Sequence, residues 1–329
     1  MNSSIMKNYR WGILGAGRIA EKFCTALNFV EGSEVYAVAS RDKNNAEAYA
    51  AKFNAAKFYT NYEDLMKDEN VDIIYIATPH AFHYTQTMAC IRHNKAVLCE
   101  KPMSLTYLQT TEMINAAKEK NVFLMEAMWT ACMPFIKKIK SLIEEDMIGK
   151  PQYVAADFGF ATPVDLEGRL YNKSLGGGSM MDIGIYPLYL ATMIFGNPSS
   201  IKTVSKLTAA QVDEYMNVVL QYADGETAHL LCSISFNTAI EAEIIGTKGK
   251  IKIHNPWFKA TNFSVHLNDG TVHNFSMPHL CNGFEHEILE VMHCLDNGLL
   301  QSEKMPHQLT LCISKIMEEV LQQAGVVYE

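Results

Sequence analysis

The chain has 329 residues, with 28 lysines and arginines against 36 acidic residues, and its formal net charge is −8. This acidic balance argues against nucleic acid or an anionic membrane as a partner. No apolar stretch approaches the ~18 residues of a membrane-spanning helix, and residues 1–8 hold no hydrophobic signal-peptide core. The 8 cysteines occur singly, without a C-x-x-C pair. We therefore expect a cytoplasmic protein of two domains, with reduced cysteines packed as small core residues.

A dinucleotide-binding fingerprint opens the chain. Residues 9–14 have the pattern of a short buried strand, and Gly15-Ala16-Gly17-Arg18-Ile19-Ala20 follows as G-x-G-x-x-A. Gly15 permits a tight turn, Gly17 lets the backbone approach a pyrophosphate, and Ala20 lets helix and strand pack closely. From Ile19 onward apolar residues fall on one helical face, and the amino end of such a helix favours an anion. The order of strand, turn and helix predicts that Gly15, Ala16, Gly17, Arg18 and Ile19 bind a dinucleotide.

The end of the second predicted strand, residues 34–39, bears on which nicotinamide cofactor binds. An acidic residue at this position would accept hydrogen bonds from the ribose hydroxyls of NAD. This chain has Ser40 and Arg41, whose hydroxyl and guanidinium suit the 2′-phosphate of NADP. Asp42 could serve the ribose, but we favour it as the N-cap of the helix through Ala46 and Ala50. We therefore expect NADP(H) to be preferred, with NAD(H) as the alternative.

Two further strands place polar residues at the same edge of the predicted sheet. Residues 72–77 precede Thr78-Pro79-His80, and residues 96–99 precede Glu100-Lys101-Pro102. Open α/β sheets hold their ligands at the carboxyl ends of their strands, and Pro102 biases Lys101 toward an extended backbone. A lysine after a strand is usually a solvated loop residue, so Lys101 becomes a catalytic candidate only because the fingerprint precedes it.

Strands and helices alternate through the first half of the chain, which predicts a parallel sheet covered on both faces. Its later elements are expected at residues 82–93, 105–120 and 122–125. After Gly149-Lys150-Pro151, short β-rich runs separated by turns predict an antiparallel sheet. These runs include residues 153–158, 217–222, 229–236 and 251–254, with helices near residues 179–195, 283–295 and 308–324. The fold class is therefore α/β, with an amino-terminal Rossmann doubly wound parallel sheet and a carboxy-terminal α/β domain whose sheet is mostly antiparallel.

Several motifs together resemble the glucose–fructose oxidoreductase / inositol dehydrogenase (Gfo/Idh/MocA) superfamily, and within it the branch that contains dimeric dihydrodiol dehydrogenase. The motifs are the opening fingerprint, Glu100-Lys101-Pro102, Glu126-Ala127-Met128-Trp129-Thr130, residues 176–187 (GGGSMMDIGIYP), Gly246-Thr247-Lys248-Gly249 and Asn255-Pro256-Trp257. The resemblance covers the chain from Tyr9 onward. It implies an NAD(P)-binding Rossmann domain over residues 1–127 and a substrate-binding and oligomerisation domain over residues 128–329. The second domain would have an open sheet, on which such proteins often form homodimers.

The resemblance also implies roles for individual residues. Glu100 and Lys101 would lie beside the nicotinamide ribose and the reacting carbon, and Tyr186 would transfer the proton. Further cofactor contacts would come from Thr78, Pro79, His80, His83 and Trp129. Oxidising a secondary alcohol needs a hydride acceptor and a base for the hydroxyl proton. Lowering the pKa of a tyrosine, ordinarily ~10, by about three units costs roughly 4 kcal/mol. A lysine ammonium at ~4 Å in an effective dielectric of ~20 supplies about that much.

The remaining candidates each have an ordinary structural explanation as well. Asp182 shares a helical face with Tyr186 and could orient Lys101 or a substrate hydroxyl, or simply help the helix to start. Arg169 is a substrate anchor or a plain surface arginine. Trp129 and Trp257, with Phe158 and Phe160, could form an apolar wall against a substrate ring, or could belong to the core. Two departures from the family leave the substrate open: Ala131-Cys132 replaces a common arginine–aromatic pair, and His80 stands where asparagine is frequent.

Histidines raise the question of a metal. His80 and His83 form one candidate set, and His286, Glu290 and His293 form another on one helix face. Neither matches the H-E-x-x-H zinc pattern, so we expect no metal and a solvated helix face. We expect an NADP(H)-favouring oxidoreductase that acts on a secondary alcohol or carbonyl of a cyclic diol, polyol or sugar, as a homodimer or higher homo-oligomer. The alternative is a catalytically silent, dinucleotide-sensing regulatory protein on the same fold.

Overall fold

A computed structural model describes residues 8–328 and divides them between two compact units. The first unit contains the chain up to Ser104, together with Gln109–Ala127 and Leu280–His307. The second contains Leu105–Leu108, Met128–His279 and the chain from Gln308. Within residues 8–328, no helix is both long and apolar enough to cross a membrane. Seven of the cysteines are buried and Cys281 is half-buried, as expected of small core residues.

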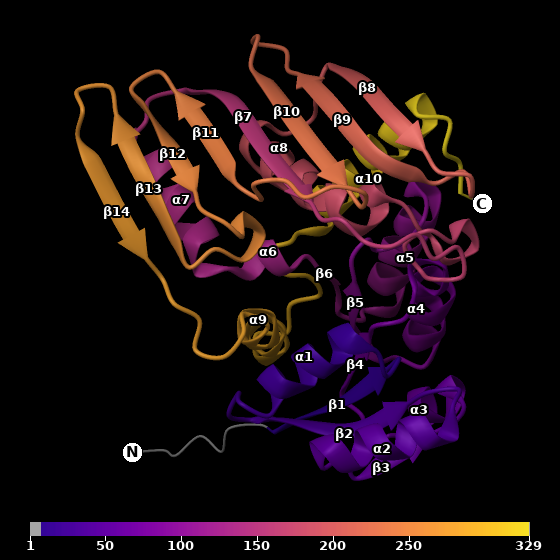
Figure 1. The fold of residues 1–329 in the computed structure, drawn as a ribbon. Coiled ribbons are helices and arrows are strands. Elements are labelled where there is room, and N and C mark those ends of the chain that lie inside the picture. Colours follow the sequence, from indigo (N-terminus) through magenta and orange to yellow (C-terminus); the bar gives the residue numbers. More distant parts are fainter. Residues whose placement is uncertain (1–7, 329) are drawn as a thin grey trace, which may run out of the picture. The chain divides into compact units, whose positions relative to one another are not determined.

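The first unit is built on a six-stranded parallel sheet with the order β3-β2-β1-β4-β5-β6 (Figure 1). Its strands are β1 (Tyr9–Leu14), β2 (Ser33–Ala39), β3 (Lys57–Tyr59), β4 (Ile73–Ile76), β5 (Ala96–Glu100) and β6 (Leu124–Ala127). The order reverses between β1 and β4, and doubly wound sheets bind ligands at such a reversal. The predicted Rossmann sheet is confirmed.

The helices of this unit arise from both ends of the chain. They are α1 (Arg18–Leu27), α2 (Lys43–Phe53), α3 (Tyr62–Lys67), the 3-10 turn η1 (His80–Phe82), α4 (His83–Arg92), most of α5 (Tyr107–Lys120) and α9 (Glu285–Asp296). The apolar face of α1 is buried as predicted, and its Phe23 ring stacks on Tyr75 of β4 with centroids 3.8 Å apart. Phe284, just before α9, meets the edge of the same Phe23 ring at 6.0 Å.

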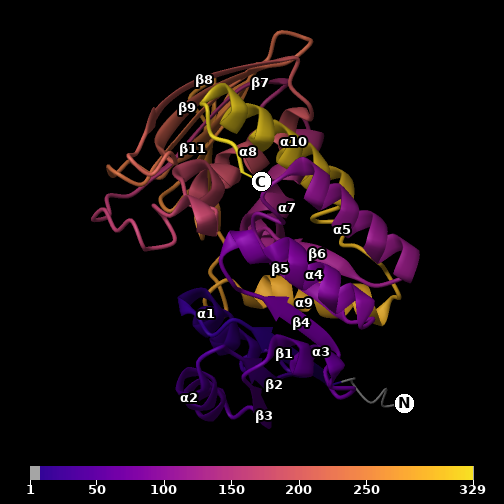
Figure 2. The ribbon, with the colours of Figure 1, turned by 90° about the vertical axis from the view of Figure 1, so that its right-hand side faces the viewer.

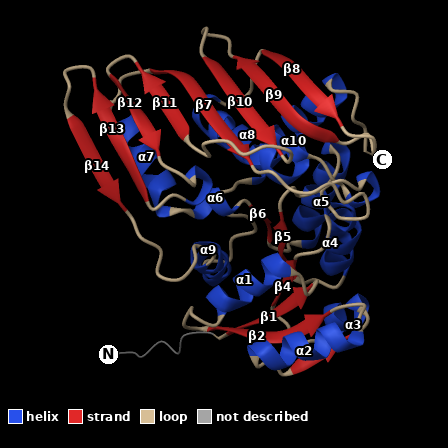
Figure 3. Cartoon of the chain, in the orientation of Figure 1, coloured by secondary structure: helices blue, strands red, loops and turns tan. Residues whose placement is uncertain are grey.

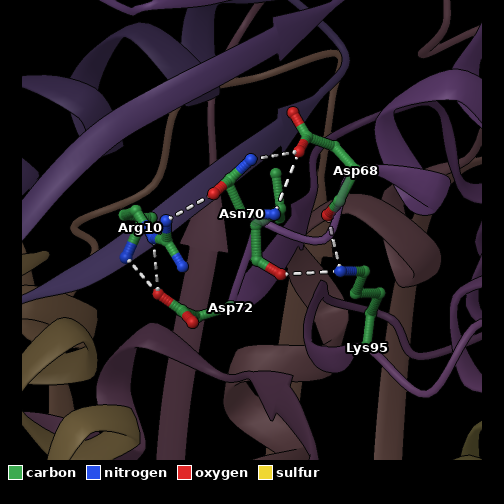
Figure 4. A network of polar contacts seen from close by, with 6 residues as sticks. Arg10, Asp68, Asn70, Asp72 and Lys95 are labelled. Atoms are coloured by element: carbon green, nitrogen blue, oxygen red, sulfur yellow. Dashed lines mark hydrogen bonds and ion pairs between the residues drawn. The ribbon is translucent and has the colours of Figure 1, made fainter.

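A polar network ties the amino-terminal ends of β1, β4 and β5 together (Figure 4). Arg10 donates from its backbone N–H to Asp72 at 2.9 Å and from its guanidinium to Asn70 at 2.9 Å. Lys95 Nζ donates to the backbone oxygens of Asp68 at 2.7 Å and Val71 at 2.8 Å. The network lies at the end of the sheet opposite to the carboxyl ends where ligands bind, so its role is structural.

The Asp68 carboxylate fixes the turn before β4. It accepts hydrogen bonds from Lys57 Nζ at 2.8 Å, from the Tyr59 hydroxyl at 2.7 Å and from the Asn70 backbone N–H at 2.9 Å. Burial raises the pKa of Asp68, but these hydrogen bonds outweigh burial and hold the pKa well below its usual range.

Replacing Asp68 with asparagine should therefore lower the melting temperature at neutral pH by about 2–4 °C. A carboxyl whose pKa is depressed on folding stabilises the protein above its unfolded pKa of ~3.9, and that contribution is lost as the pH falls below this value. Thermal unfolding of wild type and variant at neutral pH and at about pH 3 checks the sign. The difference between the two proteins should shrink in acid, and an equal difference at both pH values would contradict the assignment.

The second unit is built on an eight-stranded sheet with the order β14-β13-β12-β11-β7-β10-β9-β8. Its strands are β7 (Pro151–Gly159), β8 (Ser200–Leu207), β9 (Asp213–Gln221), β10 (Thr227–Ser233), β11 (Ala242–Gly246), β12 (Gly249–Ile253), β13 (Asn262–Leu267) and β14 (Val272–Ser276). Neighbouring strands run antiparallel except β7 and β10, which are parallel. The predicted, mostly antiparallel sheet is confirmed, although β8, β11, β13 and β14 were not among the runs that the sequence analysis named.

The helices of the second unit lie on one face of this sheet (Figures 2 and 3). The main ones are α7 (Pro134–Glu144), α8 (Ile185–Phe195) and α10 (His307–Gln323); shorter turns are α6 (Trp129–Cys132), η2 (Lys173–Leu175), the π-helical η3 (Met180–Gly184) and η4 (Trp257–Lys259). The helix predicted at residues 179–195 is thus a π-helical turn that continues into α8. The opposite face of the sheet carries no helix from the described part of the chain.

Candidate cofactor and active site

A pocket of about 290 Å³ lies at the carboxyl ends of β1, β2 and β4, wholly within the first unit. Its lining is Gly15, Ala16, Gly17, Ser40, Arg41, Asp42, Asn45, Tyr62, Ala77, Thr78 and Pro79. Seven of these residues are among the predicted cofactor contacts. Asp42, Asn45, Tyr62 and Ala77 were not predicted as cofactor contacts. The remaining predicted contacts do not line the pocket and stay predictions: Arg18, Ile19, His80, His83, Glu100, Lys101 and Trp129.

The glycine turn leaves the pocket open for an anionic ligand. Gly15 has a φ of +104°, and a Cβ on it would lie 3.0 Å from the carbonyl carbon and oxygen of Ala77, so a side chain is excluded there. A Cβ on Gly17 would meet nothing within 4 Å. Gly17 also precedes α1, whose first turn has no side-chain cap. The residues present therefore fit a dinucleotide, whose pyrophosphate the amino end of α1 would attract.

At the end of β2, Asp42 caps α2. Its side chain accepts a hydrogen bond from the Asn45 N–H at 2.9 Å, which confirms the favoured interpretation of this residue. Asn45 also donates to the Ala16 carbonyl at 3.2 Å, and so braces the glycine turn. The exposed guanidinium of Arg41 lies 5.8 Å above the Phe82 ring. Arg41 is thus the cationic side chain in the pocket lining, while the Asp42 carboxylate is engaged by the helix.

The carboxyl ends of β4 and β5 carry the Thr78 and Lys101 loops. Lys101 directly follows β5 and is half-buried, and Glu100 before it accepts a hydrogen bond from the Tyr75 hydroxyl. His83 is fully buried, with Nδ1 2.8 Å from the Pro102 oxygen and Nε2 2.9 Å from the Thr78 oxygen. The His80 ring lies 5.7 Å from the His83 ring. His83 therefore contacts the two loops from the protein interior.

The acids of α9 are packed into the first unit. Of the three residues expected on a solvated helix face, His293 is exposed and His286 is half-buried, but Glu290 is buried, so the prediction is wrong for Glu290. Glu285 accepts hydrogen bonds from the backbone N–H groups of Leu280, Cys281 and Gly283 at 2.7–3.0 Å. Glu290 accepts from Ser302 at 2.6 Å and pairs with Lys304 at 2.7 Å. Glu287 is fully buried, and burial followed by the nearby Glu100 charge raises its pKa well above the usual range. The apolar spacing of α9 gives no sign of these partners, which are distant in sequence or in the preceding loop.

In the second unit, Tyr186 lies in a cluster of aromatic rings. Its ring centroid is 5.3 Å from Phe258 and 5.7 Å from Phe158, and these two phenylalanines stack at 4.4 Å. Trp129 meets the edge of Phe258 at 5.9 Å, and Lys259 Nζ lies 5.2 Å from the Trp129 ring centroid. Phe258 thus joins Trp129 and Phe158, two of the residues expected in an aromatic wall or in the core, and sequence analysis missed it although it directly follows Trp257. The contact of these rings with a substrate stays a prediction.

Trp257 itself is part of the core. Its side chain is fully buried, and its indole N–H donates to the Asp157 carbonyl at 2.8 Å. Its predicted contact with substrate stays a prediction, and the neighbouring Phe258, rather than Trp257, lies beside Tyr186.

Asp182 and Arg169 form an ion pair, with an N–O distance of 2.5 Å. Asp182 lies in η3 and its side chain is 8% exposed, whereas Arg169 lies in the loop between β7 and η2 and its side chain is 52% exposed. The pair therefore links η3 to this loop. The arginine is therefore neither isolated on the surface nor shown to hold a ligand. Their roles toward substrate stay predictions.

Asp213 anchors the helix that carries Asp182 and Tyr186. Its carboxylate accepts hydrogen bonds from the Ser179 hydroxyl and the Met180 N–H, each at 2.6 Å, and burial raises its pKa to about 6. The Tyr328 hydroxyl, near the end of the described chain, donates to the Gly177 carbonyl. Sequence analysis missed both residues because they lie far along the chain from the glycine run that they contact.

Comparison with known proteins matches both halves of the chain to one family. The description "Oxidoreductase family, NAD-binding Rossmann fold" fits residues 9–128, and the GFO/IDH/MocA C-terminal domain fits residues 136–252. The chain belongs to the Gfo/Idh/MocA family. This member is an NAD(P)-binding oxidoreductase, with the Rossmann sheet and the mixed second sheet that the sequence predicts.

Curated relatives of this Gfo/Idh/MocA protein are similar over nearly their whole length. Trans-1,2-dihydrobenzene-1,2-diol dehydrogenase of Mus musculus is 36% identical over 97% of this chain and 98% of the relative. The Homo sapiens protein of the same name is 33% identical over the same shares. Among solved structures, aldose-aldose oxidoreductase from Caulobacter crescentus, complexed with glycerol, has a TM-score of 0.87 at 24% identity, covering 97% of this chain and 98% of that one. A 3-ketoreductase from Actinomadura kijaniata, in complex with NADP and TDP-benzene, has a TM-score of 0.86 at 23% identity, covering 96% and 98%.

Proposed function

We propose that the protein transfers hydride between NADP(H) and a secondary alcohol or carbonyl of a cyclic diol, polyol or sugar. The observation that carries this proposal is the presence, in a chain 36% identical to a dihydrodiol dehydrogenase, of Lys101 after β5 and Tyr186 within an aromatic cluster. The rings of Phe158 and Phe258 favour a substrate with a flat or cyclic apolar face. Glycerol and TDP-benzene in the related structures agree with hydroxylated or ring-bearing ligands.

The chemistry divides between cofactor and protein. NADP(H), when bound, supplies or accepts the hydride. In alcohol oxidation, Tyr186 would take the hydroxyl proton and the Lys101 ammonium would stabilise the tyrosinate. In carbonyl reduction, the same tyrosine would donate the proton. Asp182 would orient a substrate hydroxyl or Lys101, with Arg169 holding its carboxylate at 2.5 Å. Glu100, held by Tyr75, would fix the end of β5 beside Lys101.

The test is nicotinamide absorbance with NADP⁺ and NAD⁺ against trans-diols of cyclic compounds, pyranoses and polyols. We expect turnover with at least one class and a preference for NADP⁺. NADPH binding without turnover on any substrate would instead favour the alternative, a dinucleotide-sensing regulatory protein.

Arg41 should determine the cofactor preference. Replacing Arg41 with alanine should raise the Kd for NADPH about tenfold or more, because a charge-assisted contact to the 2′-phosphate is lost. The Kd for NADH, which lacks this phosphate, should stay within about twofold. Fluorescence titration of both cofactors measures the two constants, and Lys43→Ala on the adjacent first turn of α2 is the matched control. Equal weakening of NADH and NADPH by Arg41→Ala would contradict NADP specificity.

We also propose that the protein is cytoplasmic and forms a homodimer through the uncovered face of the eight-stranded sheet. Buried cysteines agree with a reducing compartment. The uncovered face of β8 and β9 exposes Val204 at 67% and Val219 at 42%, apolar side chains that a second copy would cover. Analytical ultracentrifugation tests the dimer directly.

A further inference from the structure

His83 connects two loops that carry predicted site residues. It is the first residue of α4 and is fully buried, with Nδ1 2.8 Å from the Pro102 oxygen and Nε2 2.9 Å from the Thr78 oxygen. Thr78 lines the dinucleotide pocket, and Pro102 directly follows Lys101. A single imidazole ring therefore joins the pocket wall to the Lys101 loop.

The two contacts cannot both be hydrogen bonds from a neutral ring. A carbonyl oxygen only accepts hydrogen bonds, and a neutral imidazole has one N–H to donate. The neutral ring would satisfy one carbonyl and turn a lone pair toward the other, whereas the imidazolium satisfies both. Burial lowers the pKa of His83, the two carbonyls raise it and the charge of Lys101 lowers it, with a net fall below the usual value. Geometry therefore favours a second proton that burial opposes.

His307 offers a matched comparison within the same unit. It is 3% exposed, and its Nε2 lies 2.8 Å from the Leu124 oxygen. Its Nδ1 has no hydrogen-bond partner among residues 8–328. A neutral ring protonated on Nε2 meets the single acceptor there. The second carbonyl thus distinguishes His83 from His307.

We propose that His83 is a positioning residue that holds the Thr78 and Lys101 loops together and takes up a proton when an anionic dinucleotide fills the pocket. Added negative charge offsets the cost of charging the buried ring, so the ring binds its proton more tightly in the complex. By linkage, dinucleotide affinity then rises as the pH falls through the pKa of the complex, and levels off below that of the free protein. Dinucleotide binding belongs to the family, so only the positioning of Lys101 for catalysis rests on the proposed function.

Other ionisable groups lie on the elements packed against α4. They are His80 on η1, Tyr62, Glu63, Asp64 and Lys67 on α3, Tyr75 on β4, Cys99 and Glu100 at the end of β5, and Lys101 directly after it. Burial raises the pKa values of Tyr75 and Cys99 well above the usual range, so both stay neutral between about pH 5 and 8. Glu63 contacts His93 at the far end of α4. Because His80, Glu100 and Lys101 remain, the comparison must be made between variants of His83 itself.

The experiment is a titration of NADPH and NADH from about pH 5.5 to about pH 8.5, followed by cofactor fluorescence. NADH is included because the 2′-phosphate of NADPH titrates near pH 6. His83→Phe keeps a ring but removes both donors, and should weaken binding of both cofactors about tenfold at about pH 6 and flatten the pH dependence. His83→Gln offers an uncharged amide with two N–H donors. It should keep affinity within about threefold, with the same flattened pH dependence.

His307→Phe is the control, and should lower the melting temperature without changing either Kd or its pH dependence. A wild-type pH dependence in His83→Phe or His83→Gln would overturn the proposal, as would equal losses of affinity in His83→Phe and His307→Phe. If His83→Phe does not fold, the pH dependence of His83→Gln decides. Full turnover by Lys101→Met would refute the proposed catalytic role, while the cofactor titrations would still test His83.

Discussion

Replacing Lys101 with methionine should lower kcat by about 10³-fold while leaving the Kd for NADPH within about threefold. Methionine keeps the length of the side chain but removes its charge. The ~4 kcal/mol that an ammonium can contribute toward ionising a nearby tyrosine corresponds to about three powers of ten in rate. Because the dinucleotide pocket is formed by other residues of the first unit, cofactor binding should survive. Steady-state kinetics and NADPH fluorescence measure the two quantities separately.

Lys95 supplies the matched control at the other end of the same strand. It is followed by β5, and its Nζ donates to the Asp68 and Val71 carbonyls (Figure 4). Lys95→Met removes two hydrogen bonds from a half-buried ammonium, so it should lower the melting temperature but leave kcat unchanged. A similar fall in kcat for both variants would show that Lys101 acts through stability. Unchanged kcat in Lys101→Met would refute its catalytic role.

The features that were predictable from sequence are those encoded by neighbouring residues. The G-x-G-x-x-A turn, the apolar face of α1 and the Asp42 cap of α2 all depend on positions within a few residues of one another. Ser40, Arg41, Thr78 and Pro79 were predictable for a second reason. They follow different strands of the sheet, and parallel strands bring their carboxyl ends to one edge. Local pattern and sheet topology together were sufficient to predict most of the pocket lining.

The features that were missed depend on contacts between distant segments. Glu290 belongs to a helix whose spacing suggested a solvated face, but Ser302 and Lys304 satisfy its carboxylate in the interior. Asp213 holds Ser179 and Met180 from a strand 33–34 residues further along the chain. His83 looked like a cofactor ligand, and its two carbonyl partners became visible only when the loops after β4 and β5 were placed. No residue pattern within one segment specifies such partners.

Tyr186→Phe should lower kcat by about 10²–10⁴-fold, the usual contribution of a positioned proton-transfer group. The substitution removes one hydroxyl and retains the ring, so the contacts with Phe158 and Phe258 at 5.7 and 5.3 Å should persist. Binding of NADPH should be unchanged, because the pocket in the first unit does not include this residue. The expected signature is therefore a loss in kcat with little change in the cofactor Kd, and with the melting temperature preserved.

Tyr189, on the same helix, provides an internal control for this loss. It is fully buried, and its hydroxyl has no hydrogen-bond partner in the described chain. Burial raises the pKa of Tyr189, so its hydroxyl stays protonated and takes no part in proton transfer near neutral pH. Tyr189→Phe should accordingly leave kcat within about twofold and should not destabilise the fold, since it relieves a buried polar group of its desolvation cost. Equal losses of kcat in both variants would attribute the effect to helix packing. Unchanged kcat in Tyr186→Phe alone would transfer the proton role to another group, and Asp182, one helical turn earlier, would be the next to test.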